Sequence, residues 1–241
     1  MIPSISLSDL IDHRYQSYLD ALKGSGFKGD LDGSHSSRLL CATDNSVYQC
    51  MPQAVIFPKD EKDISIALKT LHRPGFEGLI ITPRGGGTGT NGQSLNRGIV
   101  IDTSRYMKEM RDFDEENCSI YVQSGCIKDE INDFLKPYGL FFSPELSTSS
   151  RATIGGMISN DAAGQGSLKY GRTSSHIKSV DVVLVDGTIA TLKPVCGDEL
   201  QECLKLPGLL GDIYRRAYHI LKENKAKVLR QFPKLNRFMT G

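Results

Sequence analysis

The chain has 241 residues, which fits one large domain or two small ones and is long enough to bury a real core. Lysine plus arginine numbers 29 and aspartate plus glutamate 28, so charge gives no reason to expect nucleic acid as a partner. No apolar run approaches the roughly 18 residues that span a bilayer, and the first residues lack the pattern of a secretory signal. Six cysteines without a C-x-x-C spacing argue against a zinc or iron–sulfur site within the chain and favour a reducing, cytoplasmic location.

Apolar residues at helical spacing follow Ser8, which we expect to cap a first helix. A glycine- and serine-rich stretch over residues 24–37 then predicts a loop. The apolar run at 54–57 predicts a short strand that the following proline ends, and residues 59–71 repeat apolar side chains at the spacing of a helix. We expect residues 1–45 to form the first helix and a lead-in to the main domain.

Strand and helix signals alternate through the middle of the chain. Residues 79–82 and 99–102 predict strands on either side of a glycine-rich stretch, and residues 120–122 belong to another strand. Residues 127–135 predict a helix that ends near a proline and a glycine.

The second half of the chain contains a segment of small residues, a hairpin and a helical tail. Residues 144–172 are rich in small side chains and predict an extended segment with one short helix around 154–160. Asp186-Gly187, between the alternating stretches 177–185 and 188–192, is the strongest hairpin signal in the chain. After residue 194 one apolar stripe predicts helix. We therefore expect an α+β fold, with a domain over residues 46–195 and a helical tail over 196–241.

Residues 83–92, Pro-Arg-Gly-Gly-Gly-Thr-Gly-Thr-Asn-Gly, form a glycine loop directly after a predicted strand. Glycine lets backbone N–H groups approach a ligand with no Cβ in the way. Successive N–H groups that point inward form an anion site, for which a pyrophosphate is the natural occupant. A mobile surface loop is the alternative.

The glycine loop also contains a formal G-x-G-x-x-G at Gly87, Gly89 and Gly92. Only residues 93–98 separate it from the next predicted strand, which leaves no room for the crossover helix of a Rossmann site. A Walker loop is excluded as well, because no Gly-Lys-Ser/Thr follows.

A second motif, Arg-Ala-Thr-Ile-Gly-Gly-Met-Ile-Ser-Asn, covers residues 151–160 and continues to Gly164, Gly166 and residues 170–172. Its hydroxyls, amides and glycines are suited to hydrogen-bond a ribityl chain and a ring edge at short range. The alternative is a tightly packed helix crossing at which Gly155-Gly156 admits a neighbour.

These motifs, in this order and followed by Val-Val-Leu-Val-Asp-Gly at 182–187, resemble the FAD-binding domain of the vanillyl-alcohol-oxidase-type flavoproteins. The resemblance runs from about residue 44 to 192 and includes the Pro-Gln-Ala-Val-Ile-Phe-Pro segment at 52–58. It implies a PCMH-type FAD-binding fold with two small α/β subdomains. The tail, through Arg-Gln-Phe-Pro-Lys-Leu at 230–235, is similar to the FAD- and iron–sulfur-linked D-2-hydroxy-acid dehydrogenases.

The resemblance also implies a set of FAD-binding residues. The glycine loop would wrap the pyrophosphate, residues 144–150 would pass near the flavin, and residues 153–160 would contact the ribityl chain and ring. Residues 164–171 would shape the same wall, and Ile177 would lie near the adenine. The expected cofactor-binding residues are Arg84, Gly85, Gly86, Gly87, Thr88, Gly89, Thr90, Asn91, Gly92, Pro144, Glu145, Ser149, Ser150, Thr153, Ile154, Gly155, Gly156, Ser159, Asn160, Gly164, Gly166, Tyr170, Gly171 and Ile177.

Members of this family sometimes attach the flavin through a histidine in the glycine loop. Thr88 occupies that position here, so the resemblance implies a non-covalent FAD, with Cys118 and Cys126 as the remaining candidates for attachment. His176 lies next to the expected flavin wall and is the histidine to inspect in the structure. The family's catalytic histidine, its metal ligands and its iron–sulfur cysteines come later in the polypeptide. We therefore expect no catalytic residue or metal ligand here, and place any iron–sulfur cluster and divalent metal outside this chain.

The activity that the resemblance implies is oxidation of a small D-2-hydroxy acid, of the D-2-hydroxyglutarate or D-lactate type, to the 2-oxo acid. Hydride would pass to FAD, and the electron acceptor is not identified by the sequence. Two alternatives stay open: a sugar or lactone oxidase of the same superfamily, and a non-enzymatic glycine-rich interaction domain without flavin.

Overall fold

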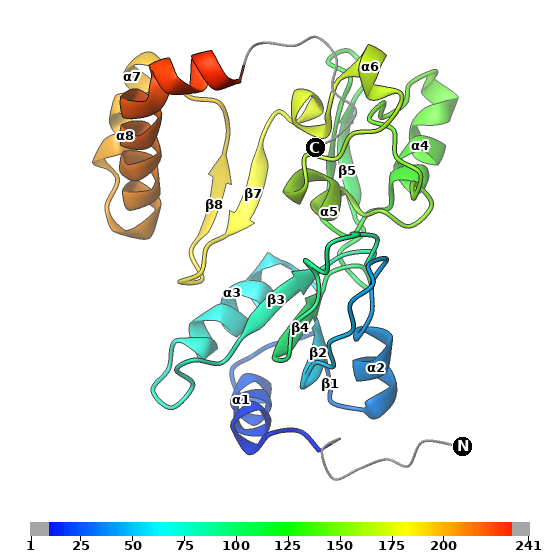
Figure 1. Ribbon diagram of the computed structural model, residues 1–241, viewed down its shortest axis with the longest axis vertical. Helices are drawn as coiled ribbons and strands as arrows, with labels where there is room; N and C mark the ends of the chain where they lie inside the picture. The colour runs from blue at the N-terminus through cyan, green and yellow to red at the C-terminus, as the bar shows by residue number, and fades with distance from the viewer. Residues whose placement is uncertain (1–9, 233–241) are drawn as a thin grey trace.

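The computed structural model describes residues 10–232. Figure 1 shows one half built on a four-stranded sheet and another built from hairpins and helices, with a helical pair beside it. In chain order the elements are α1 His13–Lys23, β1 Asp30–Asp32, α2 His35–Leu40, β2 Ala54–Phe57, α3 Glu61–Leu71, β3 Ile81–Arg84, β4 Ile99–Asp102, β5 Met110–Asp114, β6 Ser119–Val122, α4 Lys128–Leu135, η2 Lys136–Tyr138, α5 Ile154–Ser159, α6 Ser167–Tyr170, η3 Thr173–His176, β7 Val180–Val183, β8 Ile189–Leu192, α7 Gly197–Lys205 and α8 Gly208–Gln231.

The first sheet has the order β1-β2-β4-β3, with β2, β4 and β3 parallel and β1 antiparallel at one edge. Helices α1 and α3 cover one face and α2 covers the other (Figure 1). Because both faces are covered, the strand β2 is buried throughout, as parallel strands usually are. Ala54 and Ile56 pack with α1 and α3, whereas Val55 and Phe57 pack with Cys41 behind α2.

Aspartate side chains begin two of the helices in this half. Asp12 accepts a hydrogen bond from the Arg14 N–H at 2.8 Å and caps α1; Ser8, which we expected as the cap, lies outside the described residues. Asp60 caps α3 in the same way. The buried Asp63 accepts backbone N–H bonds from residues 28 and 59, both at 2.9 Å, so its carboxylate is satisfied inside the protein.

The second half is built around the antiparallel pair β5–β6, with α4 and α5 packed on it. Its core consists of Cys126, Ile131, Leu135 and Ile154. A separate hairpin, β7–β8, reaches back to the first half, because Ser65 Oγ on α3 donates to the Gly187 carbonyl at 2.5 Å. This contact is one of those that join the two halves.

Helices α7 and α8 form an antiparallel pair after the hairpin. Arg215 Nη1 donates to the carbonyls of Leu204 and Leu206, at 2.8 and 2.9 Å, and so satisfies the free end of α7. Gly211 lies against the same turn, where a Cβ would stand 1.8 Å from the Leu206 carbonyl oxygen. Pro207, which cannot continue the hydrogen bonding of α7, separates the two helices.

The structure confirms the strands at 54–57 and 99–102, the helices over 59–71 and 127–135, and the hairpin at Asp186-Gly187. The loop expected over residues 24–37 was wrong in part, because residues 30–32 pair with β2 and α2 begins at His35. The strand expected at 79–82 lies two residues later, and β5 and α6 were not anticipated. The boundaries at residues 45 and 195 stay predictions.

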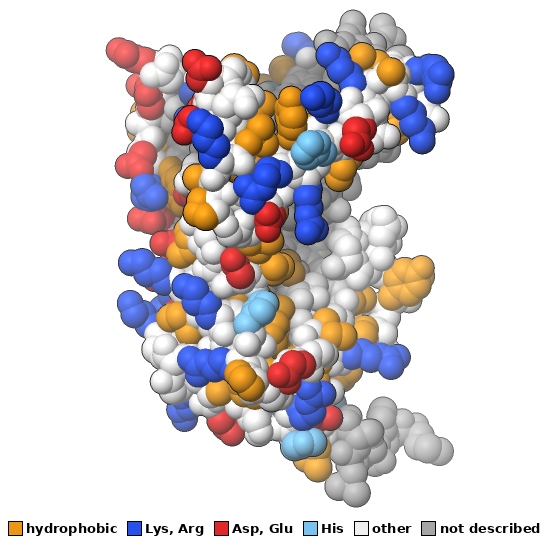
Figure 2. All heavy atoms as spheres, turned by 90° about the vertical axis from the view of Figure 1, so that its left-hand side faces the viewer, with side chains coloured by type: hydrophobic (Ala, Val, Ile, Leu, Met, Phe, Trp, Pro, Cys, Tyr) orange, Lys and Arg blue, Asp and Glu red, His pale blue; other side chains and the backbone are white. Residues whose placement is uncertain are grey.

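The face that carries α7, α8, β8 and α3 is mixed in charge. Figure 2 shows basic and acidic side chains interspersed on it, with hydrophobic side chains exposed between them. In residues 10–232 no helix combines the length and apolar character that crossing a membrane requires.

Truncation of the buried Ile99 tests the sheet. Replacing Ile99 by alanine removes apolar contacts from a position with no exposed surface, so we expect a loss of about 2–5 kcal/mol in the free energy of unfolding. Ile80, whose carbonyl accepts from the Ile99 N–H, is 51% exposed and supplies a matched control. Ile80→Ala should change stability by no more than about 0.5 kcal/mol. Equal losses in urea titrations of both variants would contradict this packing.

Candidate functional site

The glycine loop and residues 93–98 together form the entire connection between two neighbouring parallel strands. Arg84 ends β3, Ile99 begins β4, and Ile81 pairs with Ile99 in the sheet, so residues 85–98 carry the chain back along the strand. Such crossovers are usually helical, but this one contains no helix. The structure therefore agrees with the exclusion of a Rossmann site and shows that the loop itself is the crossover.

The first residues of this loop present a row of backbone donors. No residue that the structure describes accepts a hydrogen bond from the N–H groups of residues 85–90. The next one, Asn91 N–H, is taken by Gln93 Oε1 at 3.1 Å. Gly87 has a φ of +61°, a left-handed conformation of the kind that lets successive N–H groups form an anion nest. These donors are therefore free to bind water or an anion.

A positive charge and a second loop support the donors from one side. Arg84 donates through Nη2 to the Thr43 carbonyl at 2.8 Å, and its guanidinium lies directly beside Gly87. Ser94 Oγ donates to Asp44 Oδ2 at 3.3 Å, so Asp44 has a structural role in the turn. Tyr48 lies against Gly92, where a Cβ would be 3.0 Å from its ring.

The second motif supports the glycine loop from the other side. A Cβ on Gly85 would stand 2.1 Å from Thr153 Oγ1, and one on Gly86 would stand 1.9 Å from the Arg151 carbonyl oxygen. Real Cβ atoms do not approach neighbours this closely, so only glycine allows the contact. The two motifs that the sequence singled out are therefore in direct contact in the structure.

The residues of α5 divide between packing and open surface. Gly155 fits the helix-crossing alternative, because its N–H donates to Ser124 O at 2.9 Å and a Cβ would stand 2.8 Å from the Ser124 Cβ. Gly156 has open space apart from Thr153 Oγ1 at 3.4 Å. Ser159 Oγ and Asn160 Nδ2 donate to backbone carbonyls of the helix, at 2.8 and 2.9 Å. Ile154 is buried in the core, so it supports the helix from behind.

A wall of close backbone contacts continues the site beyond α5. Gly164 and Gly166 pack on Glu145: a Cβ on the first would stand 2.2 Å from the Glu145 carbonyl oxygen, and one on the second 2.4 Å from its carboxylate. Pro144 is buried beside them, and Gly171 has a φ of +83°. The structure thus brings the expected segments 144–145 and 164–171 together.

Two expected residues, Ser149 and Ser150, and the histidine singled out for inspection, His176, have other surroundings. Ser149 Oγ donates to Asp129 Oδ2 at 3.1 Å and so faces the start of α4, while Ser150 is exposed. His176 Nε2 lies 2.7 Å from the Tyr170 carbonyl oxygen and 3.3 Å from Ser143 Oγ, so its ring fixes the wall segment rather than standing free.

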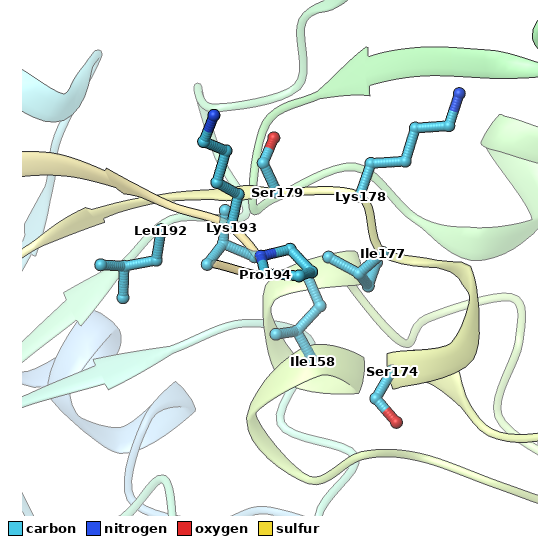
Figure 3. A pocket seen from close by; sticks show the side chains of 9 residues that line it. Ile158, Ser174, Ile177, Lys178, Ser179, Leu192, Lys193 and Pro194 are labelled. Carbon is cyan, nitrogen blue, oxygen red and sulfur yellow. The ribbon is translucent and has the colours of Figure 1, made fainter. Parts of the chain in front are cut away.

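Ile177 lines a shallow pocket of about 270 Å³ between α5 and the open ends of β7 and β8 (Figure 3). Ile158, Ile177 and Pro194 form its apolar centre, whereas Lys178 and Lys193 extend away from it (Figure 3). Both lysines already have partners: Lys178 Nζ donates to the Asn117 carbonyl at 3.1 Å, and Lys193 pairs with Glu199 at 2.8 Å. The pocket therefore offers an apolar surface rather than an anion site.

The two cysteines considered for covalent attachment have ordinary surroundings. Burial raises the pKa of the Cys126 thiol to about 11, so it stays protonated at neutral pH and donates to the Glu109 carbonyl at 3.4 Å. Cys118 lies in the β5–β6 turn with a φ of +45°. Its Sγ donates to the Glu115 carbonyl at 3.6 Å, and neither cysteine belongs to the glycine loop or the second motif.

Comparison with known proteins matches this arrangement of fold and site. The family described as FAD binding domain matches residues 52–193, more than half of the chain. D-2-hydroxyglutarate dehydrogenases of Pantoea ananatis and Escherichia coli are 46% and 44% identical over 241 residues. That alignment covers 100% of this chain but 24% of each relative, so the chain spans about a quarter of their length. A solved alkyldihydroxyacetonephosphate synthase shares the fold, with a TM-score of 0.64 and 18% identity over 80% of this chain and 38% of that one.

The sheet, the helix-free crossover and the glycine-lined wall define an α+β PCMH-type FAD-binding fold, as the sequence predicted. The chain belongs to the FAD-binding domain family. Its similarity to the D-2-hydroxy-acid dehydrogenases, expected from the helical tail, is confirmed by the relatives that match it along its whole length.

Substitutions in the glycine loop test the donor row. In Gly87→Val the left-handed φ would strain the backbone. Gly89 has no left-handed φ, so Gly89→Val would act through a steric clash, because its Cβ would stand 2.5 Å from the Gln93 amide. We expect both variants to fold and to lose FAD on gel filtration. Gly24→Val, whose Cβ meets only contacts of 3.7 Å or more, is the control that should retain FAD. Normal flavin content in both loop variants would show that the loop is only a turn.

Proposed function

We propose that this chain is the FAD-binding part of a flavin-dependent dehydrogenase that oxidises a D-2-hydroxy acid, of the D-2-hydroxyglutarate or D-lactate type, to the 2-oxo acid. The row of backbone donors at residues 85–90 carries the cofactor assignment, because these N–H groups have no acceptor among residues 10–232 and lie beside the Arg84 guanidinium. The match of the whole chain to D-2-hydroxyglutarate dehydrogenases supports the substrate class.

The residues present fit FAD in three places. The donors of residues 85–90 and the charge of Arg84 would hold the pyrophosphate. Gly156 and Asn160 on α5, with the wall at residues 164–171, would border the ribityl chain and ring, and Ile177 would lie at the adenine end. When bound, FAD supplies the two-electron acceptor chemistry that oxidation of an alcohol carbon requires.

The chain's own task in this proposal is to bind and orient the cofactor. Within residues 10–232 no group of three or more His, Cys, Asp or Glu side chains could hold a metal ion. We propose that a catalytic base, a divalent metal and an iron–sulfur cluster, where the full-length enzyme uses them, come from other parts of the polypeptide. The small hydroxy acid would meet the flavin from that side, and the electron acceptor stays open.

Flavin binding and its mode are tested by one purification. We expect the chain to bind FAD with the absorbance of an oxidised flavin and to release it unchanged into the supernatant after acid precipitation. The reason is that the Thr88 hydroxyl is a poor nucleophile without a nearby base, and Cys126 is buried and protonated. Colour retained in the washed pellet would contradict non-covalent binding. A chain that takes up no FAD would favour the glycine-rich interaction domain.

An activity assay tests the proposal that the catalytic base lies outside this chain. We expect the purified 241-residue chain, loaded with FAD, to oxidise neither D-2-hydroxyglutarate nor D-lactate in a dye-reduction assay. The reason is that it corresponds to about a quarter of the dehydrogenases it matches. The full-length Escherichia coli relative serves as the positive control. Turnover by the 241-residue chain itself would contradict the proposal that the base lies elsewhere, and oxidation of a sugar or lactone by a full-length version would favour the oxidase alternative.

A further inference from the structure

Gln93 follows the glycine loop and makes contacts on three sides with its side-chain amide. Its Oε1 accepts from the Asn91 N–H at 3.1 Å, and its Nε2 donates to Asn160 Oδ1 at the end of α5, also at 3.1 Å. The amide also lies under Gly89, where a Cβ would stand 2.5 Å from Nε2. One side chain therefore touches the loop twice and the second motif once.

The partner of Gln93 is itself fixed. Asn160 Nδ2 donates to the Gly156 carbonyl at 2.9 Å, which orients Oδ1 toward Gln93. The chain of contacts thus runs from Asn91 through Gln93 and Asn160 to Gly156. Gly85 and Gly86 already join the start of the loop to the second motif, so the amide bridge joins its other end.

We propose that Gln93 is a positioning residue for the cofactor. Its amide holds the second half of the glycine loop against α5, so that the donors of residues 85–90 converge on one anion. This role rests on the proposed binding of FAD and adds to it a residue that lies just outside both motifs in the sequence. A loop without the bridge would keep its contacts with Tyr48 and Asp44 but would lose the connection between its second half and α5. It would then present the same donors in more than one arrangement.

The experiment is a double-mutant cycle on flavin affinity. Gln93→Met keeps the volume and removes both hydrogen bonds, Asn160→Ala removes the partner, and the third variant combines them. We expect Gln93→Met to weaken FAD binding roughly 3- to 10-fold, the range for losing one or two net hydrogen bonds. In the Asn160→Ala background the same change should cost less than about 2-fold, because the bridge is already gone. The melting temperature of the flavin-free chain should stay the same, which a merely structural residue would not allow.

Gln201→Met on the exposed side of α7 is the matched control and should bind FAD like the unmodified chain. Equal effects of Gln93→Met in both backgrounds, or no effect in either, would overturn the positioning role. Failure of the unmodified chain to bind FAD would instead overturn the proposed function. A flavin-free measurement decides the bridge separately: amide hydrogen exchange at Asn91 should speed up in Gln93→Met, and an unchanged rate would sink the inference whatever the flavin result.

Discussion

The close approach of two backbone segments at Gly85 and Gly86 is the contact on which the site depends. The strand β3 delivers the glycine loop onto residues 151–153 so tightly that no side chain fits between them. Glycines are costly to order, because they lose more conformational freedom on folding than other residues. The contact fixes the start of the loop, and the N–H groups of residues 85–90 have no acceptor among the described residues. Close packing and ligand binding are thus two results of the same absence of side chains.

The sheet gives this loop two rigid ends. β3 and β4 are parallel neighbours, β4 is central in the sheet, and Val100 is buried between the two layers of helices. The crossover lacks the regular hydrogen bonding of a helix and has only a few internal bonds, such as Asn91 N–H to Gln93 Oε1 and Leu95 N–H to the Gly92 carbonyl. Its shape therefore depends largely on the segments that it contacts. Arg84 and the loop at 41–44 hold it on one side, and the second motif holds it on the other. The arrangement prepares the anion site before any ligand arrives, which lowers the entropy lost on binding.

Glycines required by close packing could be predicted from the sequence, whereas residues that act through a partner distant in the sequence could not. The glycine loop and the second motif were predictable, because close approach selects glycine at successive positions. Gln93 was not, since its partner Asn160 lies 67 positions away and no local pattern links them. The short strand β1 was missed for a similar reason: Asp-Leu-Asp has no strand pattern and depends on pairing with β2. Gly155 packs on Ser124, as the helix-crossing alternative expected, and its contact with a ligand stays a prediction because close packing and ligand approach select the same residue.

The hydrogen bond from Ser65 to the Gly187 carbonyl joins residues that are 122 positions apart. Contacts of such long sequence separation carry a large loop-closure entropy and tend to form late in folding. During synthesis, α3 and the first sheet emerge from the ribosome well before the β7–β8 turn exists, so the sheet has time to form without it. The Ser65 hydroxyl, already placed by the finished helix, then becomes the point at which the later hairpin is recruited. The sheet therefore precedes the hairpin turn both in the order of synthesis and in the order of assembly that sequence separation favours.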